Sequence, residues 1–325
     1  MIRYSAKPFV SIVVASYNRK DILEKTLNAL LNQSYPSDSY EILFVDNASS
    51  DDSVGLVNKK FKNFISEGRL KVLALEENSG SSGSYVRALD KANKDWVYML
   101  KMDEDMILDK FCLQHLVDVA LKYPRSGMIG GKIFYLQEPK KLQTIGSKFS
   151  PFYSISRSIG KNNMNHQQFN EVKEFDGVSG CMFLVSRALK EEVGWFDEDY
   201  FLYYDDHDLM FRALKAGYKN YFSPLSFGFH DTSTGDFKKF NNVQWLYYSS
   251  RGGWMFFHKN FKKLSLAKII YFLAFTLRSI LNIIFISFIS GGKNYRNLIK
   301  AYLSGSSHGL RRKTSGRFNL DIFKS

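Results

Sequence analysis

The sequence predicts an α/β fold with a mostly parallel central sheet, followed by amphipathic or apolar helices at the C-terminus. Three observations lead to this expectation. Continuous apolar runs rich in β-branched residues alternate with segments of helical spacing over about the first hundred residues, which is typical of strands buried on both faces of a parallel sheet. A short polar loop follows each of these runs. A long apolar stretch with basic flanks occurs only near the C-terminus.

The expected elements alternate regularly through the first third of the chain. The expected strands cover residues 9–15, 40–45, 70–75 and 95–102, and the expected helices cover residues 21–32, 53–65 and 85–92. Ligands of such folds bind outside the carboxyl ends of the strands. We therefore expect the polar loops to converge in one cleft. These loops are residues 16–19, 46–52, 78–84 and 103–105.

One apolar run ends abruptly in three carboxylates, Asp103, Glu104 and Asp105. Carboxylates are almost never fully buried unless they are paired or bind a metal. At a frayed strand end, the side chains of Asp103 and Asp105 would lie on one side as hard oxygen ligands suited to Mg²⁺ or Mn²⁺, and Glu104 would point away. Because short motifs match often by chance, a solvated acidic loop is the alternative.

A second acidic cluster contains Asp205, Asp206 and Asp208. It stands at the start of a segment with helical spacing that Gly217 is expected to end. The helix dipole favours acidic side chains at this position, so a capping role is the alternative to a chemical one. Three acids within four positions are more than a cap needs.

The basic excess of the chain lies at its C-terminus. The net charge is +13, and the residues from Arg251 onward contain 14 Lys or Arg against one acidic residue, so residues 1–250 balance. Such a tail is expected to bind an anionic surface, either nucleic acid or anionic lipid. A nucleic-acid-binding tail would interleave aromatic and basic residues, whereas this tail holds a long aliphatic block, residues 264–290. We therefore expect a membrane surface and no nucleic acid as partner.

Lys268, Arg278 and Asn282 interrupt the aliphatic block. An arginine near mid-bilayer would cost roughly 2.5–3.5 kcal/mol on insertion scales, so we expect helices that lie in the membrane interface. A single span and a solvated basic helix packed on the catalytic domain are the alternatives. Each flanking basic residue near an anionic leaflet would contribute about 1 kcal/mol. These residues are Lys259, Lys262, Lys263, Lys293, Arg296, Lys300, Arg311, Arg312 and Lys313.

The cysteines and the N-terminus indicate the compartment. Cys112 and Cys181 both lie in apolar surroundings, which indicates buried thiols in a reducing environment. The first apolar run, residues 9–15, is too short for a signal-peptide core or a membrane span. We therefore expect a peripheral protein at the cytoplasmic face of the cell membrane.

Successive motifs of the chain resemble, in order and in spacing, those of family 2 glycosyltransferases: residues 10–19, 42–51 and 102–105. The resemblance implies a GT-A type fold that binds a nucleotide-diphosphate sugar. It places Asp46 against the base or ribose, and it gives Asp103 and Asp105 the task of holding a divalent metal, Mn²⁺ or Mg²⁺, on the diphosphate. Further residues would line the nucleotide, namely Ser16, Asn18 and Asn47.

The glycine-rich stretch and the histidines extend the resemblance. Gly80, Gly83 and Arg87 lie in a stretch that resembles the glycine-rich loop of the galactofuranosyl and rhamnosyl branch, where they would contact the donor. The family carries a metal-binding histidine at the position of His230, which would be the third metal ligand, although a lone histidine is more often structural. His207 is a weaker candidate for the metal.

The second acidic cluster resembles the acceptor-side motif of the family. The resemblance makes Asp206 the general base that deprotonates the acceptor hydroxyl, with Asp205 and Asp208 as the next candidates. A base in this position contributes about 100- to 10,000-fold to the rate. One base and one metal-held leaving group describe a single in-line displacement, so the anomeric centre should invert.

The expected protein is an inverting, metal-dependent glycosyltransferase. It would move a sugar from a UDP- or dTDP-linked donor, with UDP-galactofuranose and dTDP-rhamnose favoured, to a glycan or lipid-linked acceptor. Residues 1–105 and 106–250 would form the donor and acceptor halves of one GT-A domain, and residues 251–325 the membrane-associating helices. A nucleotidyltransferase or sugar-nucleotide pyrophosphorylase, and a non-catalytic nucleic-acid-binding protein, are the alternative functions.

Overall fold

The computed structural model divides the chain into two compact units, each of which is described by itself. The first unit comprises residues 1–148, 158–196 and 209–232, and the second comprises residues 149–157, 197–208 and 233–325. The structure describes residues 7–150, 155–165, 168–233, 242–260, 266–289 and 295–311. The second unit therefore includes short segments from the middle of the chain in addition to the C-terminal helices.

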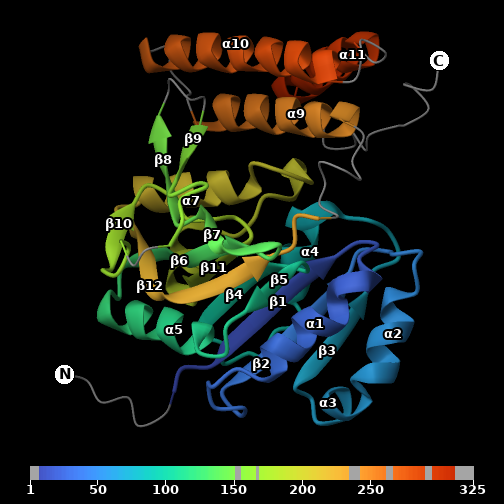
Figure 1. The fold of residues 1–325 in the computed structure, drawn as a ribbon, viewed down its shortest axis with the longest axis vertical. Coiled ribbons are helices and arrows are strands. Elements are labelled where there is room, and N and C mark those ends of the chain that lie inside the picture. The colour runs from blue at the N-terminus through green and yellow to red at the C-terminus, as the bar shows by residue number, and fades with distance from the viewer. Residues whose placement is uncertain are drawn as a thin grey trace. The chain divides into compact units, whose positions relative to one another are not determined.

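A ten-stranded sheet forms the centre of the first unit within the described residues (Figure 1). Its strands are β1 (Val10–Ser16), β2 (Tyr40–Asp46), β3 (Leu70–Ala74), β4 (Tyr98–Asp103), β5 (Met106–Leu108), β6 (Ser126–Tyr135), β7 (Glu138–Thr144), β10 (Lys173–Phe175), β11 (Met182–Ser186) and β12 (Lys219–His230). The order is β10-β12-β6-β11-β4-β1-β2-β3, with β5 paired to β12 and β7 paired to β6. Strands β3, β2, β1 and β4 are parallel, whereas β11 is antiparallel to both of its neighbours. The sheet is thus mixed and largely parallel, as expected.

The helices of the first unit connect and cover these strands. They are α1 (Lys20–Leu31), α2 (Ser53–Lys60), α3 (Lys62–Ser66), α4 (Gly80–Leu89), α5 (Cys112–Lys122) and α6 (Arg187–Val193). Two short strands, β8 (Gly146–Ser150) and β9 (Ile155–Ile159), form a separate ladder, and helix α7 (Asp205–Lys215) begins at the second acidic cluster. Gly217 has a φ of +81° and follows α7, which confirms the expected helix end.

Strands β1 and β2 confirm the prediction of a parallel sheet from the apolar runs. Every residue of β1 and β2 is buried, because both faces of these strands are covered. Their register pairs Ser16 with Asp46, and β4 pairs Asp103 with Ala15 on the other side of β1. The polar residues that end the three strands therefore lie along one edge of the sheet.

Two expected boundaries in this region were wrong. Residues 80–84 belong to α4 and not to a loop, and Gly80 begins the helix with a φ of +74°. The side chain of Asn78 accepts a hydrogen bond from the Gly80 N–H, which stabilises this start. The single helix expected over residues 53–65 is interrupted at the buried Phe61, so that α2 and α3 are separate helices.

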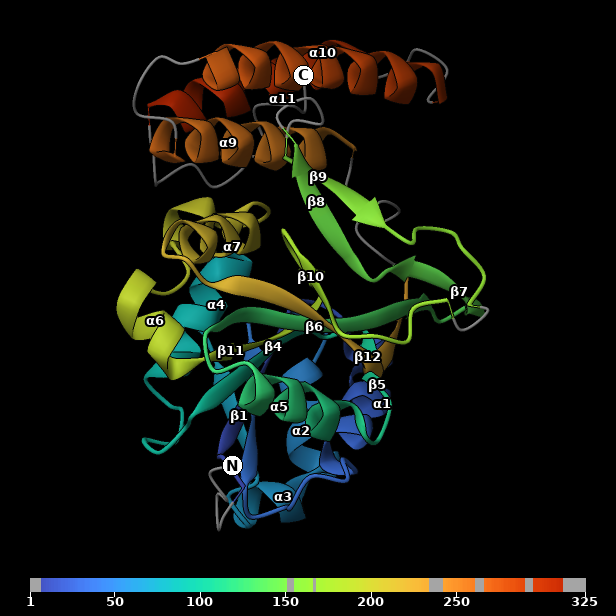
Figure 2. The ribbon, with the colours of Figure 1, turned by 90° about the vertical axis from the view of Figure 1, so that its left-hand side faces the viewer.

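Three long helices make up most of the described part of the second unit: α9 (Asn242–Asn260), α10 (Leu266–Ile289) and α11 (Tyr295–Leu310). They lie side by side in both ribbon views (Figure 2). Helices α9 and α11 approach closely because α11 carries Gly305 and Gly309. A Cβ atom at Gly305 would lie 2.4 Å from the carbonyl oxygen of Tyr247, and one at Gly309 would lie 2.4 Å from that of Arg251. Over the part of the chain that the structure describes, none of the helices has the length and apolarity needed to cross a membrane.

Candidate active site

Ser16 and Asp46 lie next to each other at the carboxyl edge of the sheet. Asp46 Oδ2 accepts a hydrogen bond from the Ser49 N–H at 2.9 Å. Asp46 Oδ1 and Ser16 Oγ are both buried and have no hydrogen-bond partner among the described residues. Because buried polar atoms in folded proteins are nearly always hydrogen-bonded, this pair marks a place where a polar ligand can supply the missing bonds.

Asn18 and Asn47 hold the loops around this pair in shape. Asn18 adopts a left-handed conformation with a φ of +54°, and its side-chain oxygen accepts from the Ser50 N–H at 2.8 Å. Asn47 donates to the carbonyl oxygen of Gly80 at 2.9 Å, and its side-chain oxygen accepts from the Ser79 N–H at 2.8 Å. Each asparagine thus joins two loops of the same edge, which is a positioning role.

The glycine-rich stretch lies on α4. Gly80 and Gly83 are buried in the first turns of that helix, and Arg87 is exposed near its end. The structure therefore brings Gly80 to the loop of Asn47, while Arg87 lies two helical turns further along α4.

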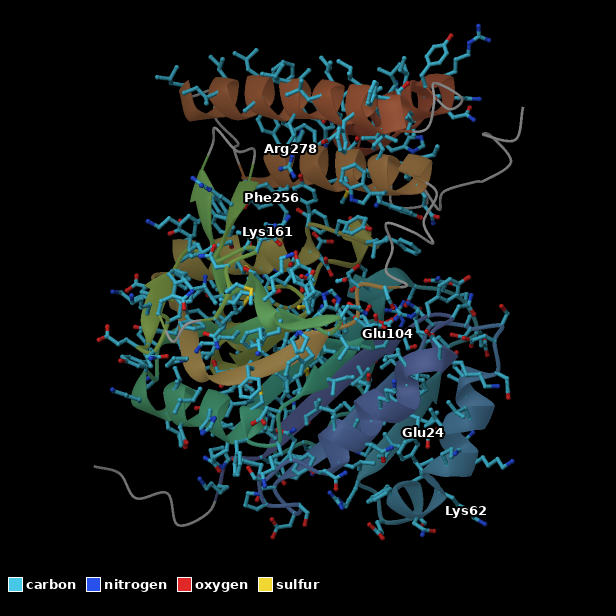
Figure 3. The ribbon with its side chains drawn as sticks, in the orientation of Figure 1. Glu24, Lys62, Glu104, Lys161, Phe256 and Arg278 are labelled. Carbon is cyan, nitrogen blue, oxygen red and sulfur yellow. The ribbon has the colours of Figure 1, made fainter. Side chains whose placement is uncertain are left out.

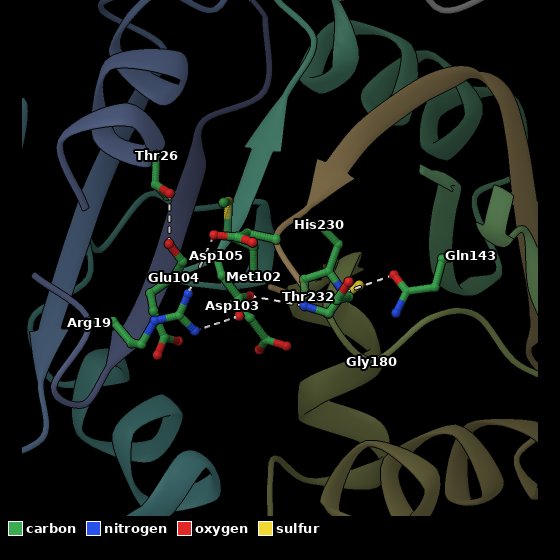
Figure 4. A network of polar contacts seen from close by, with 12 residues as sticks. Arg19, Thr26, Met102, Asp103, Glu104, Asp105, Gln143, Gly180, His230 and Thr232 are labelled. Atoms are coloured by element: carbon green, nitrogen blue, oxygen red, sulfur yellow. Dashed lines mark hydrogen bonds and ion pairs between the residues drawn. The ribbon is translucent and has the colours of Figure 1, made fainter. Parts of the chain in front are cut away.

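The carboxylate triplet forms the turn between β4 and β5 (Figure 4). Asp103 is the last residue of β4, and its carboxylate pairs with Lys101 from the same strand. Glu104 follows in the turn, and its carbonyl oxygen accepts a hydrogen bond from Thr26 Oγ1 at 2.7 Å. Burial raises the pKa of Glu104 well above its usual range, and the charges of Asp105 and Asp103 raise it further.

Asp105 lies between two basic side chains from distant parts of the sequence (Figure 4). Arg19 Nη1 is 2.9 Å from Asp105 Oδ2, and His230 Nε2 is 3.1 Å from Asp105 Oδ1. Burial acts to raise the pKa of Asp105, but the hydrogen bond and charge of His230 and the charge of Arg19 outweigh it, so the pKa is lowered. Asp21 and Asp231 make two longer contacts to the same guanidinium, at 3.5 Å and 4.0 Å.

The orientation of the His230 ring is fixed by Gln143. His230 Nδ1 lies 2.8 Å from the side-chain oxygen of Gln143. An amide oxygen only accepts, so Nδ1 carries the proton and the lone pair of a neutral ring lies on Nε2, which faces Asp105. Burial acts to lower the pKa of His230, yet the hydrogen bond to Asp105 and its charge raise it overall. A neutral His230 and Asp105 would therefore present two metal-binding atoms to one point.

The donor set at this point fits a divalent cation. A histidine that donates its other ring N–H to an oxygen acceptor is the usual arrangement of a metal-ligating histidine. A cation would replace the proton that His230 and Asp105 share. The structure brings together two of the three expected ligands, because Asp103 pairs with Lys101. Over the described part of the chain, no group of three His, Cys, Asp or Glu side chains is already arranged to hold a metal.

Sequence reasoning assigned no role to Arg19 or Lys101, which supply positive charge to the triplet. The signal was present, since Arg19 ends the first polar loop and Lys101 interrupts a buried apolar run. Their partner carboxylates belong to the triplet, for which the sequence predicts a metal as the compensating charge, and the structure shows that Arg19 and Lys101 supply positive charge as well. The Gln143 contact carried no signal, because it lies 87 residues from His230.

The second acidic cluster lies in the second unit, where its members differ in environment. Asp208 is fully buried, and its carboxylate pairs with Lys259 Nζ at 2.9 Å. Asp205 is also buried. Asp206 accepts a hydrogen bond from the His207 N–H at 2.7 Å, and its Oδ1 lies 2.8 Å from His207 Nδ1. The ion pair gives Asp208 a structural task, so Asp206 remains the carboxylate of the cluster that can meet a ligand.

Asp206 lines a cavity of about 230 Å³ within the second unit. The start of α7 and the loop before it, α9 and α10 all contribute to the wall. The lining residues are Tyr203, Tyr204, Asp206, His207, Trp245, Leu246, Ser249, Ser250, Phe275, Arg278, Ser279 and Asn282. Partial burial acts to lower the pKa of His207, but the charge of Asp206 and its hydrogen bond raise it overall. The cavity thus combines an acid, an imidazole, a guanidinium and aromatic rings.

The fold is shared with a solved glycosyltransferase. The structure of mannosyltransferase PcManGT from Pyrobaculum calidifontis, determined with GDP-Man and Mn²⁺, aligns with a TM-score of 0.56 at 16% identity and covers 95% of this chain and 89% of that one. This likeness confirms the GT-A-like α/β fold with C-terminal helices.

Sequence comparisons give the family. TuaG of Bacillus subtilis, a glycosyltransferase named for teichuronic acid biosynthesis, is 36% identical over 104 residues, which is 32% of this chain and 39% of that protein. Poly-beta-1,6-N-acetyl-D-glucosamine synthase of Staphylococcus epidermidis is 23% identical over 193 residues, 58% of this chain and 42% of that protein. The chain thus spans less than half the length of these two relatives. The family model described as Glycosyl transferase family 2 matches residues 11–194, which is more than half of the sequence. The chain therefore belongs to that family.

Proposed function

We propose that this protein is an inverting, metal-dependent glycosyltransferase that moves a sugar from a nucleotide-diphosphate donor to a glycan or lipid-linked acceptor. The observation that carries the proposal is the convergence of Asp105 and His230 Nε2, with the ring oriented by Gln143, at the sheet edge where ligands of α/β folds bind. Family membership supports the same reaction class.

The donor belongs to the first unit in this proposal. The unsatisfied oxygens of Ser16 and Asp46 take the base or ribose of the nucleotide. Asp103, Asp105 and His230 would hold Mn²⁺ or Mg²⁺, and Asp103 could do so only without its present ion pair to Lys101. A divalent cation bound there would neutralise charge on the departing diphosphate. Lys101, the present partner of Asp103, is a further cation at the same edge.

Asp206 acts as the general base in the second unit. It takes the proton of the acceptor hydroxyl as the hydroxyl oxygen bonds to the anomeric carbon. The bond from that carbon to the diphosphate oxygen breaks at the same time, and the diphosphate leaves with the electron pair. A single displacement inverts the anomeric centre. His207 is a positioning residue in this proposal, since its hydrogen bond fixes the orientation of the Asp206 carboxylate.

The donor is most simply a UDP- or dTDP-sugar, and the glycine-rich stretch before Arg87 favours UDP-galactofuranose or dTDP-rhamnose. The test is a panel of UDP-, dTDP- and GDP-sugars incubated with purified protein and Mn²⁺, with release of nucleoside diphosphate as the readout. We expect turnover of at least one UDP- or dTDP-sugar and loss of turnover on chelation. The proposal fails if the panel yields neither binding nor turnover, and turnover of a GDP-sugar alone would overturn the donor assignment.

The protein also docks on an anionic membrane in this proposal, as a peripheral protein of the cytoplasmic face. Ten large apolar side chains of α10 are between 44% and 85% exposed, which is an unusual apolar surface for a soluble helix. Arg296 and Lys300 are exposed on α11, Arg311 is exposed directly after it, and the residues from Arg251 onward carry the whole net charge of +13. The combination fits an anionic leaflet. Other basic residues of the expected set lie outside the described residues, namely Lys262, Lys263, Lys293, Arg312 and Lys313.

A further inference from the structure

Helix α10 presents two different surfaces on opposite sides. Its exposed apolar side chains include a row with a spacing of three and four residues: Leu266, Ile269, Leu273, Leu277, Ile280, Ile284 and Phe288. Phe275, Ser279 and Asn282 line the cavity, and each is two residues from a member of that row. Since each residue turns an α-helix by about 100°, two residues turn it by about 200°. One face of α10 is therefore exposed and apolar, and the opposite face forms a wall of the cavity.

Arg278 lies at the edge of the cavity face. It lines the cavity and is exposed, and Figure 3 shows it on the side of α10 toward α9. Of the α10 side chains that the structure describes, Arg278 is the charged one. A guanidinium has five N–H donors in a planar fork, and a bidentate carboxylate uses two of them. Even when it pairs with an acid of the cavity, Arg278 can bind a further anionic oxygen.

The size of the cavity limits what it can enclose. Its volume of about 230 Å³ is below the roughly 300–1,000 Å³ of pockets that enclose a complete drug-sized ligand. It suits a phosphate group with the adjoining sugar hydroxyls, and not a whole oligosaccharide. The other wall residues suit a sugar as well, since Trp245 and Tyr203 offer aromatic surface and Asn282 offers amide hydrogen bonds.

The thickness of α10 sets the depth of the bound phosphate. A helix with its side chains is about 10–12 Å across. If the exposed apolar row lies in the acyl boundary of a leaflet, the cavity on the opposite face lies at the level of the lipid headgroups or just outside them. A phosphate in the cavity would then remain in the polar region while an attached lipid chain reaches the bilayer around α10.

We propose that the cavity beside Asp206 binds the phosphate of a lipid-linked acceptor, with Arg278 as the phosphate-binding residue and α10 as the element that lies between the phosphate and the lipid. This inference rests on the proposed function, because it uses Asp206 as the base that activates the acceptor. It goes further in naming the acceptor class and the residue that selects it.

The test uses the full chain and two vesicles of equal surface charge. The phosphate vesicles contain phosphatidylcholine and a polyprenyl phosphate, and the reference vesicles contain phosphatidylcholine, the uncharged polyprenol and enough phosphatidylglycerol to match the charge. The fluorescence of Trp245, identified by the variant Trp245→Phe, reports binding in the cavity. We expect at least tenfold tighter binding to the phosphate vesicles. Arg278→Gln should abolish this preference, Arg278→Lys should retain part of it, and Arg125→Gln, an exposed arginine of the first unit, should leave it unchanged. Circular dichroism confirms that each variant is folded.

Three results would overturn the inference. The first is equal binding of the wild-type protein to the two vesicles, and the second is an unchanged preference in Arg278→Gln. The third is saturation of the Trp245 signal by inorganic phosphate in solution without an effect of the polyprenyl phosphate, which would assign the cavity to a soluble phosphate. None of these results tests the binding of the nucleotide sugar. Failure of the wild-type protein to bind any nucleotide sugar would instead count against the proposed function.

Discussion

His230 and Asp105 form a pair of side chains whose ionisation is linked. His230 has a raised pKa and Asp105 a lowered one, because each stabilises the charged form of the other. The contribution of His230 to stability is fully present below the unfolded pKa of about 6.5 and is lost as the pH rises through the raised folded value. The contribution of Asp105 is present above its unfolded pKa and is lost as the pH falls. The pair is therefore strongest in mildly acidic solution.

The first prediction concerns the proton that this pair shares. Binding of Mn²⁺ should release a proton near pH 6.5, because the cation and the proton compete for His230 Nε2. Titration calorimetry in two buffers with different ionisation enthalpies measures the release. His230→Gln should weaken Mn²⁺ binding by at least tenfold and abolish proton release. Gln143→Leu should weaken binding less, since it removes only the partner that orients the ring. Equal Mn²⁺ affinity of wild-type protein and His230→Gln would contradict the assignment.

Which residues of the site could be predicted depended on how local their signals are. Ser16, Asp46 and the triplet follow apolar runs, so their place at one sheet edge follows from strand topology. The partners of Asp105 lie 86 and 125 residues away in the sequence, at Arg19 and His230. Such pairs depend on tertiary structure. A local pattern can single out Arg19 at the end of a polar loop, but it does not indicate that Arg19 pairs with Asp105. His230 was expected from the family resemblance and not from its own surroundings.

At the scale of single elements, β1 and β2 were predictable because their buried runs leave no other interpretation. Helix α4 was harder to place. Its first residues are Gly and Ser, which have low helix propensity and are typical of loops, so its start was expected five residues later. The buried positions of Gly80, Gly83 and Ser84 against the sheet edge explain why packing overrides propensity there.

The second prediction concerns the contact between α9 and α11. Gly305→Val should lower the unfolding free energy by about 1–3 kcal/mol, because a side chain would overlap the carbonyl of Tyr247 and force the helices apart. Leu303→Ala, at an exposed position of the same helix, serves as the control and should change stability little. Denaturation followed by circular dichroism gives both values. Equal stability of the two variants would show that the close approach of the helices is not required.

At the scale of the whole molecule, the basic excess lies in residues 251–325 and α10 carries a row of exposed apolar side chains, while residues 1–250 are balanced in charge. This separation agrees with the proposed function, in which the first unit binds the donor and the second unit binds the membrane surface. The sequence predicted the apolar block, but its division into an exposed row and a cavity face became visible only in the structure.

The third prediction concerns membrane attachment. The full chain should sediment with vesicles that contain anionic lipid, and added salt should weaken the binding because the exposed charges are screened. Leu277→Ser combined with Ile284→Ser should reduce binding, since both side chains are more than half exposed on α10. The matched control is Leu225→Ser in the first unit, a change at a leucine that is 61% exposed, and it should bind as the wild-type protein does. Unchanged sedimentation of the α10 variant would contradict the proposal that this helix binds the membrane surface.

The most direct measurement of the central claim compares wild-type protein with Asp206→Asn, using the donor identified by the nucleotide-sugar panel. Transfer should fall by about 100- to 10,000-fold, because the amide cannot accept the proton of the acceptor hydroxyl. Binding of the nucleoside diphosphate with Mn²⁺, measured by calorimetry, should stay within about twofold of wild type, because Asp46, Asp105 and His230 are unchanged. Transfer by Asp206→Asn at the wild-type rate would contradict the assignment of the base and the mechanism built on it.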